Sequence, residues 1–397
     1  MMDSPLPHPS RPQVYRHFHR IAWLAVVLTF CVVVFGAFVR LSDAGLSCPD
    51  WPTCYGRATW PQAAQDVSDH AASAIRPFED HKAWREQVHR HLAAILGVLV
   101  LVLALLAARR RSRGLAQVLG ASALVALAIP MYMRGHTWEA LAVAGVGEAL
   151  LLVAAFRWSN TDLSRAAVLT LAVVVFQALL GKWTVTMLLK PVIVMGHLLG
   201  GMLTFSLLTW MAWRATHVPI VHADATALRR WLLGAIAVVG VQIARGGWVS
   251  ANYAALACGA GGWTTSEHHY FDFPRCVGQW WPPTDFGEGF VLWRGVGVDY
   301  EGGVLDGAAR IAIQMAHRVF AIVVFAWLML TSWRLLRTPG LRGWALVLAV
   351  LTIAQVLLGV LNVKLALPLP VAVLHNGGAA LLLFVLVGQL ARLRRPD

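Results

Sequence analysis

Long apolar runs bounded by charged residues are the feature of this 397-residue sequence that most limits how it can fold. About 20 apolar residues suffice to cross a bilayer as a helix, and lipid admits only helices or closed barrels, because every backbone polar group must be satisfied internally. Charged residues make up only 13% of the chain, about half the share usual in soluble domains. We therefore predict an all-α polytopic membrane protein. The expected spans are residues 21–40, 87–108, 115–133, 139–156, 166–187, 191–212, 231–249, 311–332, 344–364 and 371–391.

The third and fourth runs are the least regular of these. Pro130 and Gly135 interrupt the region between residues 115 and 156, and a proline inside a helix removes a backbone hydrogen bond. Two full spans or one re-entrant pair both fit this pattern. The sequence therefore predicts about eight to ten transmembrane helices, and either number leaves both chain ends on the same side of the membrane.

The distribution of Lys and Arg predicts the orientation in the membrane. With the N-terminus placed in the cytoplasm, more than half of the 33 basic residues fall in short inside loops and tails. Residues 1–20 then form a cytoplasmic tail and residues 213–230 a cytoplasmic linker, while the long loops around 41–86 and 250–310 lie outside. The net charge of +13 is thus a topology signal, and nucleic acid is not expected as a partner.

The chain repeats itself, which predicts its internal architecture. Gln177 and His197 recur 178 residues later as Gln355 and His375. Three further segments recur in the same order: Glu86–Arg90 matches Gln314–Arg318, Asp50–Gly56 matches Asp272–Gly278, and Leu46–Cys48 matches Leu256–Cys258. We expect two tandem, pseudo-symmetric four-helix bundles in residues 21–212 and 231–397. The unmatched residues from about 109 to 165 are expected to form a helical pair inserted into the first bundle, and the second half has its own insertion between Cys258 and Asp272.

Four histidines occupy repeated positions inside the expected spans: His89, His197, His317 and His375. An ionisable residue within a membrane helix is costly and indicates function. Each half offers two imidazoles at similar depth on two helices of one bundle, which suits axial ligation of a haem iron. Zinc is the rival metal, but it would need a further Cys, carboxylate or His ligand, and the sequence offers mainly Glu86 at this depth. The plain alternative is a set of hydrogen-bonded structural histidines.

Arginines lie next to these histidines. Arg90 and Arg318 each follow the first histidine of a half, and we expect them to pair with haem propionates. Arg40 and Arg245, near other outer helix ends, are further candidates for the same role. The alternative is that these long side chains only reach the membrane interface.

The two repeats differ at one chemically important position. Glu86 in the first half is replaced by Gln314 in the second, each three residues before a histidine and on the same helical face. A carboxylate near a metal or haem can act as a general base or nucleophile, whereas an amide can only hydrogen-bond. We therefore expect the first half to be reactive and the second to transfer electrons. In the alternative, Glu86 is an exposed first-turn residue favoured by the helix dipole.

The cysteines fall into two loop pairs. Cys48 and Cys54 share the first outer loop, and Cys258 and Cys276 share the second, where they are further apart. Outside placement favours a disulfide in each loop. Metal binding and thiol exchange remain the alternatives, while Cys31 lies inside the first span and is expected to be a core residue.

Together these motifs resemble those of the haem A synthase family, and the resemblance covers nearly the whole chain in order. The matching segments are Ala44–Cys54, Glu86–Arg90, Trp183–Thr186 with His197–Gly201, Asn252–Ala255, Gly278–Phe286, His317–Arg318 and Leu367–Asn376. This chain departs from the family pattern in its inserted pair near 109–165 and in the greater length of its second cysteine loop.

The resemblance implies an eight-helix, two-bundle fold and an oxidoreductase that converts the C8 methyl of haem O to the formyl of haem A by successive hydroxylation and dehydration. His89 and His197 would flank the substrate haem, and Glu86 would be the reactive carboxylate. His317 and His375 would hold a haem b cofactor, and Cys48 and Cys54 would form a disulfide.

The resemblance also implies partners and a location. A haem O synthase would supply the substrate, an electron acceptor would be needed, and a homo-oligomer is left open. The expected location is the bacterial plasma (inner) membrane, with the cysteine loops on its outer face. Two other functions fit paired histidines: a two-haem membrane electron-transfer cytochrome, with two equivalent sites, and a haem transporter or assembly chaperone, which binds without chemistry.

Overall fold

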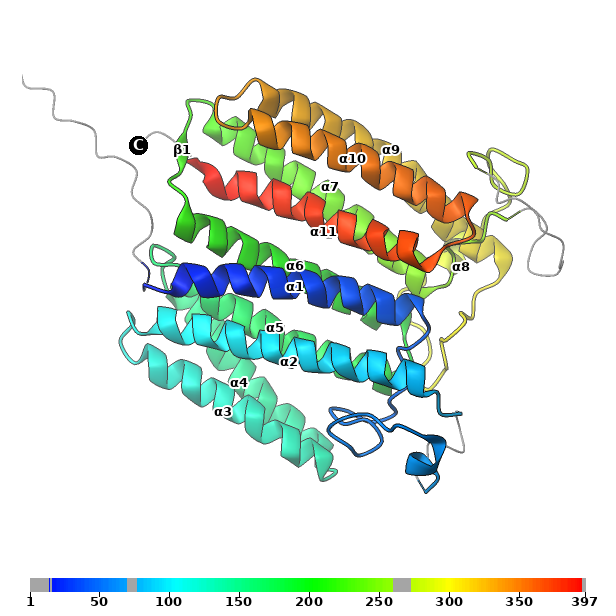
Figure 1. The fold of residues 1–397 in the computed structure, drawn as a ribbon, viewed down its shortest axis with the longest axis horizontal. Helices are drawn as coiled ribbons and strands as arrows, with labels where there is room; N and C mark the ends of the chain where they lie inside the picture. Colours follow the sequence, from blue (N-terminus) through cyan, green and yellow to red (C-terminus); the bar gives the residue numbers. More distant parts are fainter. Residues whose placement is uncertain (1–13, 15, 70–76, 260–272, 395–397) are drawn as a thin grey trace, which may run out of the picture.

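The computed structural model describes residues 14, 16–69, 77–259 and 273–394, and within them ten helices are long and apolar enough to cross a membrane (Figure 1). The prediction of an all-α polytopic membrane protein is therefore confirmed. These helices are α1 (Phe18–Leu41), α2 (Asp80–Ala108), α3 (Gly114–Met133), α4 (Thr137–Arg157), α5 (Ser164–Thr186), α6 (Pro191–Thr216), α7 (Ala225–Ala251), α9 (Gly307–Leu336), α10 (Arg342–Lys364) and α11 (Leu369–Arg392).

The doubtful third and fourth runs are full-length helices and not a re-entrant pair. α3 has 20 residues and α4 has 21, with Pro130 accommodated in the last turn of α3. The two lie side by side, and a Cβ added at Gly147 of α4 would come within 2.8 Å of the Ala121 carbonyl oxygen of α3. The glycine therefore permits a close helix–helix approach.

Eight of the ten helices form two closed rings of four. In the first ring α1 packs on α2, α2 on α5, α5 on α6, and α6 back on α1. In the second ring α7 packs on α9, α9 on α10, α10 on α11, and α11 back on α7. The rings meet where α6 and α1 contact α11, and where α6 contacts α7. Figure 1 shows α3 and α4 at the edge of the first ring, where they contact α2 and α5.

Both described ends of the chain lie at one end of the bundle, and the long loops lie at the other (Figure 1). We call the latter the cysteine-loop end, formed among the described residues by 42–69, 77–79, 252–259 and 273–306. At the opposite end, the two-residue strands β1 (Ile220–Val221) and β2 (Leu393–Arg394) pair in parallel and tie the linker between the rings to the C-terminal segment.

The two cysteine loops share a backbone design, which extends the sequence repeat into three dimensions. Cys48 bonds to Cys54 and Cys258 bonds to Cys276, so both expected disulfides are present. In each loop the second cysteine pairs by backbone hydrogen bonds with the residue three further on, Arg57 or Gln279. The extra residues of the second loop fall largely in 260–272, outside the described residues. A short helix, α8 (Phe286–Gly289), follows and packs on α9.

Two of the functional helices begin earlier than their apolar runs. α2 starts at Asp80, seven residues before the expected span, and α9 starts at Gly307, where the Asp306 carboxylate caps the helix by accepting from the Ala309 N–H. These early turns extend α2 and α9 into the cysteine-loop end. They bring Glu86 and Gln314 within reach of the loops.

Candidate functional site

Each of the four repeated histidines packs its imidazole against a glycine. That glycine lies on a neighbouring helix in the same ring of four helices. A Cβ added at Gly36 of α1 would lie 2.8 Å from Cε1 of His89 on α2, and one added at Gly181 of α5 would lie 3.3 Å from Cε1 of His197 on α6. The same arrangement recurs in the second ring. There Gly246 of α7 lies against His317 of α9, at 3.2 Å, and Gly359 of α10 lies against His375 of α11, at 3.1 Å. A side chain larger than glycine would force the imidazole to move at Gly36, and it would be tighter than an ordinary contact at the other three positions.

The four imidazoles also share an unsatisfied atom. Nδ1 of His89, His197, His317 and His375 is buried and has no hydrogen-bond partner, although each residue as a whole is only half-buried. His89 and His197 lie on α2 and α6, which are diagonally opposed in the first ring of helices, and His317 and His375 lie on α9 and α11, which are diagonally opposed in the second. The structure thus brings together the two pairs that the sequence repeat predicts.

Gly200 and Gly378, which follow the second histidine of each half, lie against glutamine side chains of the neighbouring helix. In the structure the Gln177 side chain fills the space beside Gly200, and the Gln355 side chain fills the space beside Gly378. Gln355 also donates from Nε2 to the His375 carbonyl oxygen at 2.8 Å. These glutamines fix the helices that carry the histidines.

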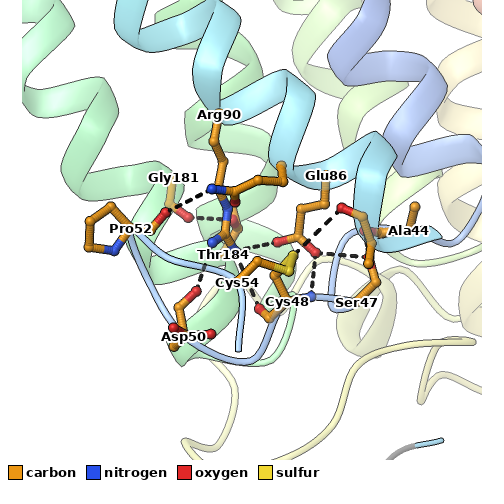
Figure 2. Close-up of polar contacts among 12 residues, drawn as sticks. Ala44, Ser47, Cys48, Asp50, Pro52, Cys54, Glu86, Arg90, Gly181 and Thr184 are labelled. Atoms are coloured by element: carbon orange, nitrogen blue, oxygen red, sulfur yellow. Dashed lines mark hydrogen bonds and ion pairs between the residues drawn. A yellow bond between two sulfur atoms is a disulfide. The ribbon is translucent and has the colours of Figure 1, made fainter. Parts of the chain in front are cut away.

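Glu86 is buried one helical turn from His89, on the side of the cysteine-loop end, with 5% of its surface exposed. Figure 2 shows its carboxylate pointing into the first cysteine loop. Oε2 accepts from the Cys48 backbone N–H at 2.8 Å and from the Ser47 hydroxyl at 3.0 Å. Oε1 accepts from the Arg90 guanidinium at 2.6 Å. The alternative of an exposed first-turn residue is therefore wrong.

Arg90 links the same helix to the loop. Its Nη1 donates to the backbone carbonyls of Asp50, at 2.7 Å, and Thr53, at 2.6 Å, while its Nη2 donates to the Cys48 carbonyl at 3.3 Å as well as to Glu86 (Figure 2). Charge-assisted hydrogen bonds of this kind are the stronger ones in proteins. Arg90 therefore holds the disulfide loop over the histidine pair.

The second half repeats this scheme with neutral chemistry. Gln314, 4% exposed, donates from Nε2 to the Ala255 carbonyl at 3.2 Å, in place of the contacts that Glu86 makes. Arg318 donates to the Arg275 carbonyl at 3.0 Å, and Arg275 corresponds in the repeat to Thr53. The architecture is thus shared, whereas in the described part of the chain the matched position is an acid beside the first histidine pair and an amide beside the second.

The remaining candidate arginines also contact protein groups. Arg40 of α1 donates to the Tyr253 hydroxyl at 3.0 Å and to the Ser250 carbonyl at 2.8 Å, and so joins the two rings of helices. Arg245 donates to the Ala316 carbonyl at 2.7 Å and lies over the Phe320 ring. Their described contacts stabilise the cysteine-loop end.

The donor set fits a haem better than a zinc ion. Among the described residues no group of three or more His, Cys, Asp and Glu side chains could hold a metal ion, so the third ligand that zinc would need is missing there. Paired imidazoles on facing helices, with buried Nδ1 atoms and a glycine behind each ring, suit two axial ligands of one iron. His317 and His375 could therefore hold a haem cofactor, and His89 and His197 could hold a haem substrate.

The sequence repeat pairs Gly181 with Gly359, at the same separation of 178 residues as His197 and His375, but it does not reveal that they lie behind the imidazoles. Sequence reasoning missed Gly36 and Gly246, which lie in apolar runs. They are separated by 210 residues, as are Cys48 and Cys258. Extending the repeat comparison into the first helix of each half would have identified them.

Comparison with known proteins agrees with this site. The family model COX15-CtaA, described as cytochrome oxidase assembly protein, matches residues 19–135 and 139–387. A haem A synthase of Shewanella oneidensis is 36% identical over 375 residues, which cover 93% of this chain and 95% of that protein. A haem A synthase of Caulobacter vibrioides is 26% identical over 399 residues, covering 94% and 96% of the two chains.

The family match spans both rings of helices and both cysteine loops, including all four histidines, Glu86 and Gln314. On this evidence the chain belongs to the haem A synthase family of cytochrome oxidase assembly proteins.

Proposed function

We propose that this protein is a haem A synthase, an oxidoreductase that oxidises the C8 methyl of haem O to the formyl of haem A. The observation that carries the proposal is the unequal repeat: two histidine pairs in matching glycine-backed sites, with a buried carboxylate beside the first pair and an amide beside the second. Binding needs only the imidazoles, whereas proton transfer to or from a reacting methyl group needs an acid or base.

In this proposal the first half is the reactive one. His89 and His197 hold the substrate haem between α2 and α6, and the glycines behind them set the depth at which each ring lies. Arg90, the Ser47 hydroxyl and the Cys48 N–H orient the Glu86 carboxylate. A carboxylate held by three donors is pre-organised for proton exchange or for attack on an activated substrate carbon.

The second half would hold haem b through His317 and His375. When bound, that cofactor supplies one-electron redox chemistry. Gln314 keeps the hydrogen-bonding geometry of its helix without offering a proton-accepting carboxylate. The domain division that follows is a substrate-haem bundle in residues 21–212 and a haem b bundle in residues 231–397.

We further propose that the cysteine-loop end faces outward from a bacterial plasma membrane and that the N-terminus lies in the cytoplasm. Two disulfides at one end favour an oxidising compartment there. Basic residues gather in the short loops and tails at the opposite end, as cytoplasmic segments do. A haem O synthase would supply the substrate, and a separate electron acceptor would remove the electrons.

The test is expression in a host that makes haem O, followed by chromatography of the extracted haems. Wild type is expected to yield haem A. Glu86→Gln, which gives the first half the second half's own residue, is expected to retain bound haem and to accumulate haem O. Gln314→Ala is the control at the matching position and should still yield haem A.

Unchanged haem A from Glu86→Gln would overturn the assignment of Glu86. Wild type that binds haem but makes no haem A would instead favour a two-haem electron-transfer cytochrome or a haem transporter.

A further inference from the structure

An apolar groove opens on the outward face of α1, between α2 and α11. Its lining is Phe30, Cys31, Val34, Phe35 and Phe38 of α1, with Trp84 of α2 and Val373 of α11. The groove holds about 570 Å³. The lining is aromatic and aliphatic apart from the Cys31 thiol and the indole of Trp84, which suits a hydrocarbon occupant.

The groove is continuous with the first histidine pair. Phe35, which lines the groove, also stacks on the His89 ring, with centroids 6.4 Å apart and planes at 27°. The next residue, Gly36, is the glycine against which His89 packs. One turn of α1 thus faces the imidazole on one side and the groove on the other.

In the second half the repeat places different side chains at positions that match the groove lining. At the offset of 210 residues, Phe35 corresponds to Arg245 and Phe38 corresponds to Trp248. Arg245 places a charge where the first half has a phenyl ring, and its guanidinium bonds to the Ala316 carbonyl.

Side chains also fill the matching space in the second half. Trp248 is 2% exposed and donates to the Gly289 carbonyl at 2.8 Å. It packs in a cluster with Leu305 and Ile313, and Met195 and Phe290 pack against that cluster. The second half therefore has a charged and a buried side chain at two positions where the first half has phenyl rings that line the groove.

We propose that this groove binds the isoprenoid chain of the substrate haem. The inference rests on the proposed function, in which the first half takes haem O and the second takes haem b. Haem O carries a long isoprenoid chain on its macrocycle, and haem b does not. A groove beside the first histidine pair, with a charged and a buried side chain at the matching positions beside the second, fits that chemical difference.

The consequence is control over which methyl group reacts. Two axial imidazoles fix the iron but leave the macrocycle free to rotate about the axis that joins them. A chain seated in the groove selects one rotation and so presents one edge of the macrocycle to Glu86. Moving the isoprenoid chain from the lipid tails into the apolar groove changes its free energy little, because both are hydrocarbon environments. The groove therefore contributes orientation more than affinity. Phe35 and Trp84 are accordingly positioning residues.

Cys31 is exposed, so the prediction that it is a core residue is wrong. It provides a direct test, because it lines the groove and because the other four cysteines of the sequence are in disulfides. The purified full-length protein, in bilayer discs, is treated with N-ethylmaleimide, and the labelled fraction of Cys31 is followed by peptide mass spectrometry. The experiment is run with no added haem, with haem O and with haem b, and binding to the first half is monitored by absorbance.

Haem O at 90% occupancy should slow the labelling about tenfold, since only the unoccupied fraction reacts. Haem b should leave the rate unchanged even when it occupies the same histidines. The control is the Leu24→Cys, Cys31→Ser double variant, whose thiol lies two turns away on the exposed face of α1. Its labelling should not respond to either haem.

Equal protection of Cys31 by both haems, or no protection while haem O is bound, would overturn the proposal and leave bilayer lipid as the occupant. Failure of haem O to bind the first half at all would instead count against the proposed function.

A second variant gives an independent reading. Cys31→Trp fills the groove from a lipid-exposed position, so folding is expected to persist, which the retained haem b absorbance would confirm. It should leave haem O bound but lower the yield of haem A by about threefold or more, because the displaced chain no longer selects one rotation of the macrocycle. An unchanged yield from the bound haem O would contradict the proposal.

Discussion

Replacing Gly36 with alanine tests the packing on which the first histidine pair depends. The added Cβ would lie 2.8 Å from Cε1 of His89, whereas carbon atoms in contact are usually about 3.5–4.0 Å apart. The imidazole must therefore move by at least about 0.7 Å. A misplacement near 1 Å costs on the order of 100-fold in a reaction that depends on positioning. We expect Gly36→Ala to lose most of its haem A synthesis.

The effect on stability is predicted to be small, which separates positioning from unfolding. Overpacking costs about 1–3 kcal/mol, while exchanging Gly for Ala within a helix contributes about 1 kcal/mol in the opposite direction. The net destabilisation is then between zero and about 2 kcal/mol. Gly240→Ala, in α7, is the control: a Cβ there meets nothing within 4 Å, so only the stabilising contribution should appear.

Thermal unfolding in detergent, the absorbance of bound haem and haem A yield are the measurements for both variants. Gly246→Ala should act more mildly, and on the second-half haem alone, because its Cβ would lie 3.2 Å from Cε1 of His317. The reasoning would be refuted if Gly36→Ala kept the wild-type spectrum and yield and unfolded at the same raised temperature as Gly240→Ala.

Three further predictions concern the cysteine-loop end and the inserted pair. Arg90→Lys cannot reproduce the hydrogen bonds to Asp50, Thr53 and Glu86. It should therefore lower the free energy of unfolding, measured by denaturant titration, by about 1–3 kcal/mol. An unchanged value would contradict the loop-anchoring role of Arg90. The Cys258–Cys276 disulfide spans 18 residues and the Cys48–Cys54 disulfide spans 6. Removing the first by Cys→Ser substitution should lower the free energy of unfolding by about 1 kcal/mol more than removing the second, as measured by thermal unfolding. The reverse order would count against a loop-entropy origin of this stability. Burial acts to raise the pKa of Asp162, but hydrogen bonds from Ser164 and Arg111 outweigh it and leave that pKa below its usual value. A lowered carboxylate pKa stabilises the fold above the unfolded pKa of about 4, and this stability is lost as the pH falls through the folded pKa. Asp162→Asn should therefore reduce stability at neutral pH and flatten its fall below about pH 4, and an unchanged pH profile would refute the ion pair's contribution.

Much of the fold follows from the sequence because membrane helices are specified locally. Each apolar run must satisfy its own backbone hydrogen bonds, so length and hydropathy alone locate the ten spans. The starts of α2 and α9 were harder to predict, since both precede the apolar runs. In α2 the early turns are polar, and Glu86 and Arg90 bond to the first cysteine loop, a tertiary contact that hydropathy does not record. In α9 the Asp306 carboxylate caps the helix, which begins four residues before its expected span.

The site was predictable to the extent that it obeys the repeat. The histidine pairs, both disulfides and the Glu86 and Gln314 positions all follow from matching one half to the other. The contacts of Arg90 could not be predicted in this way. The sequence shows a cation next to a candidate haem ligand, but it does not show where the carbonyl groups of the loop point. The groove on α1 was hidden for a similar reason: whether apolar side chains leave a space depends on how three helices meet.

The most direct test of the account counts haems in variants that lack one histidine. The protein is expressed with haem O available, purified, and its bound haems are extracted and identified. His89→Ala or His197→Ala should remove haem O and haem A while haem b remains, and His317→Ala or His375→Ala should remove haem b. Loss of both haems together from a folded single variant, or wild-type protein without porphyrin absorbance, would contradict two separate histidine-bound haem sites.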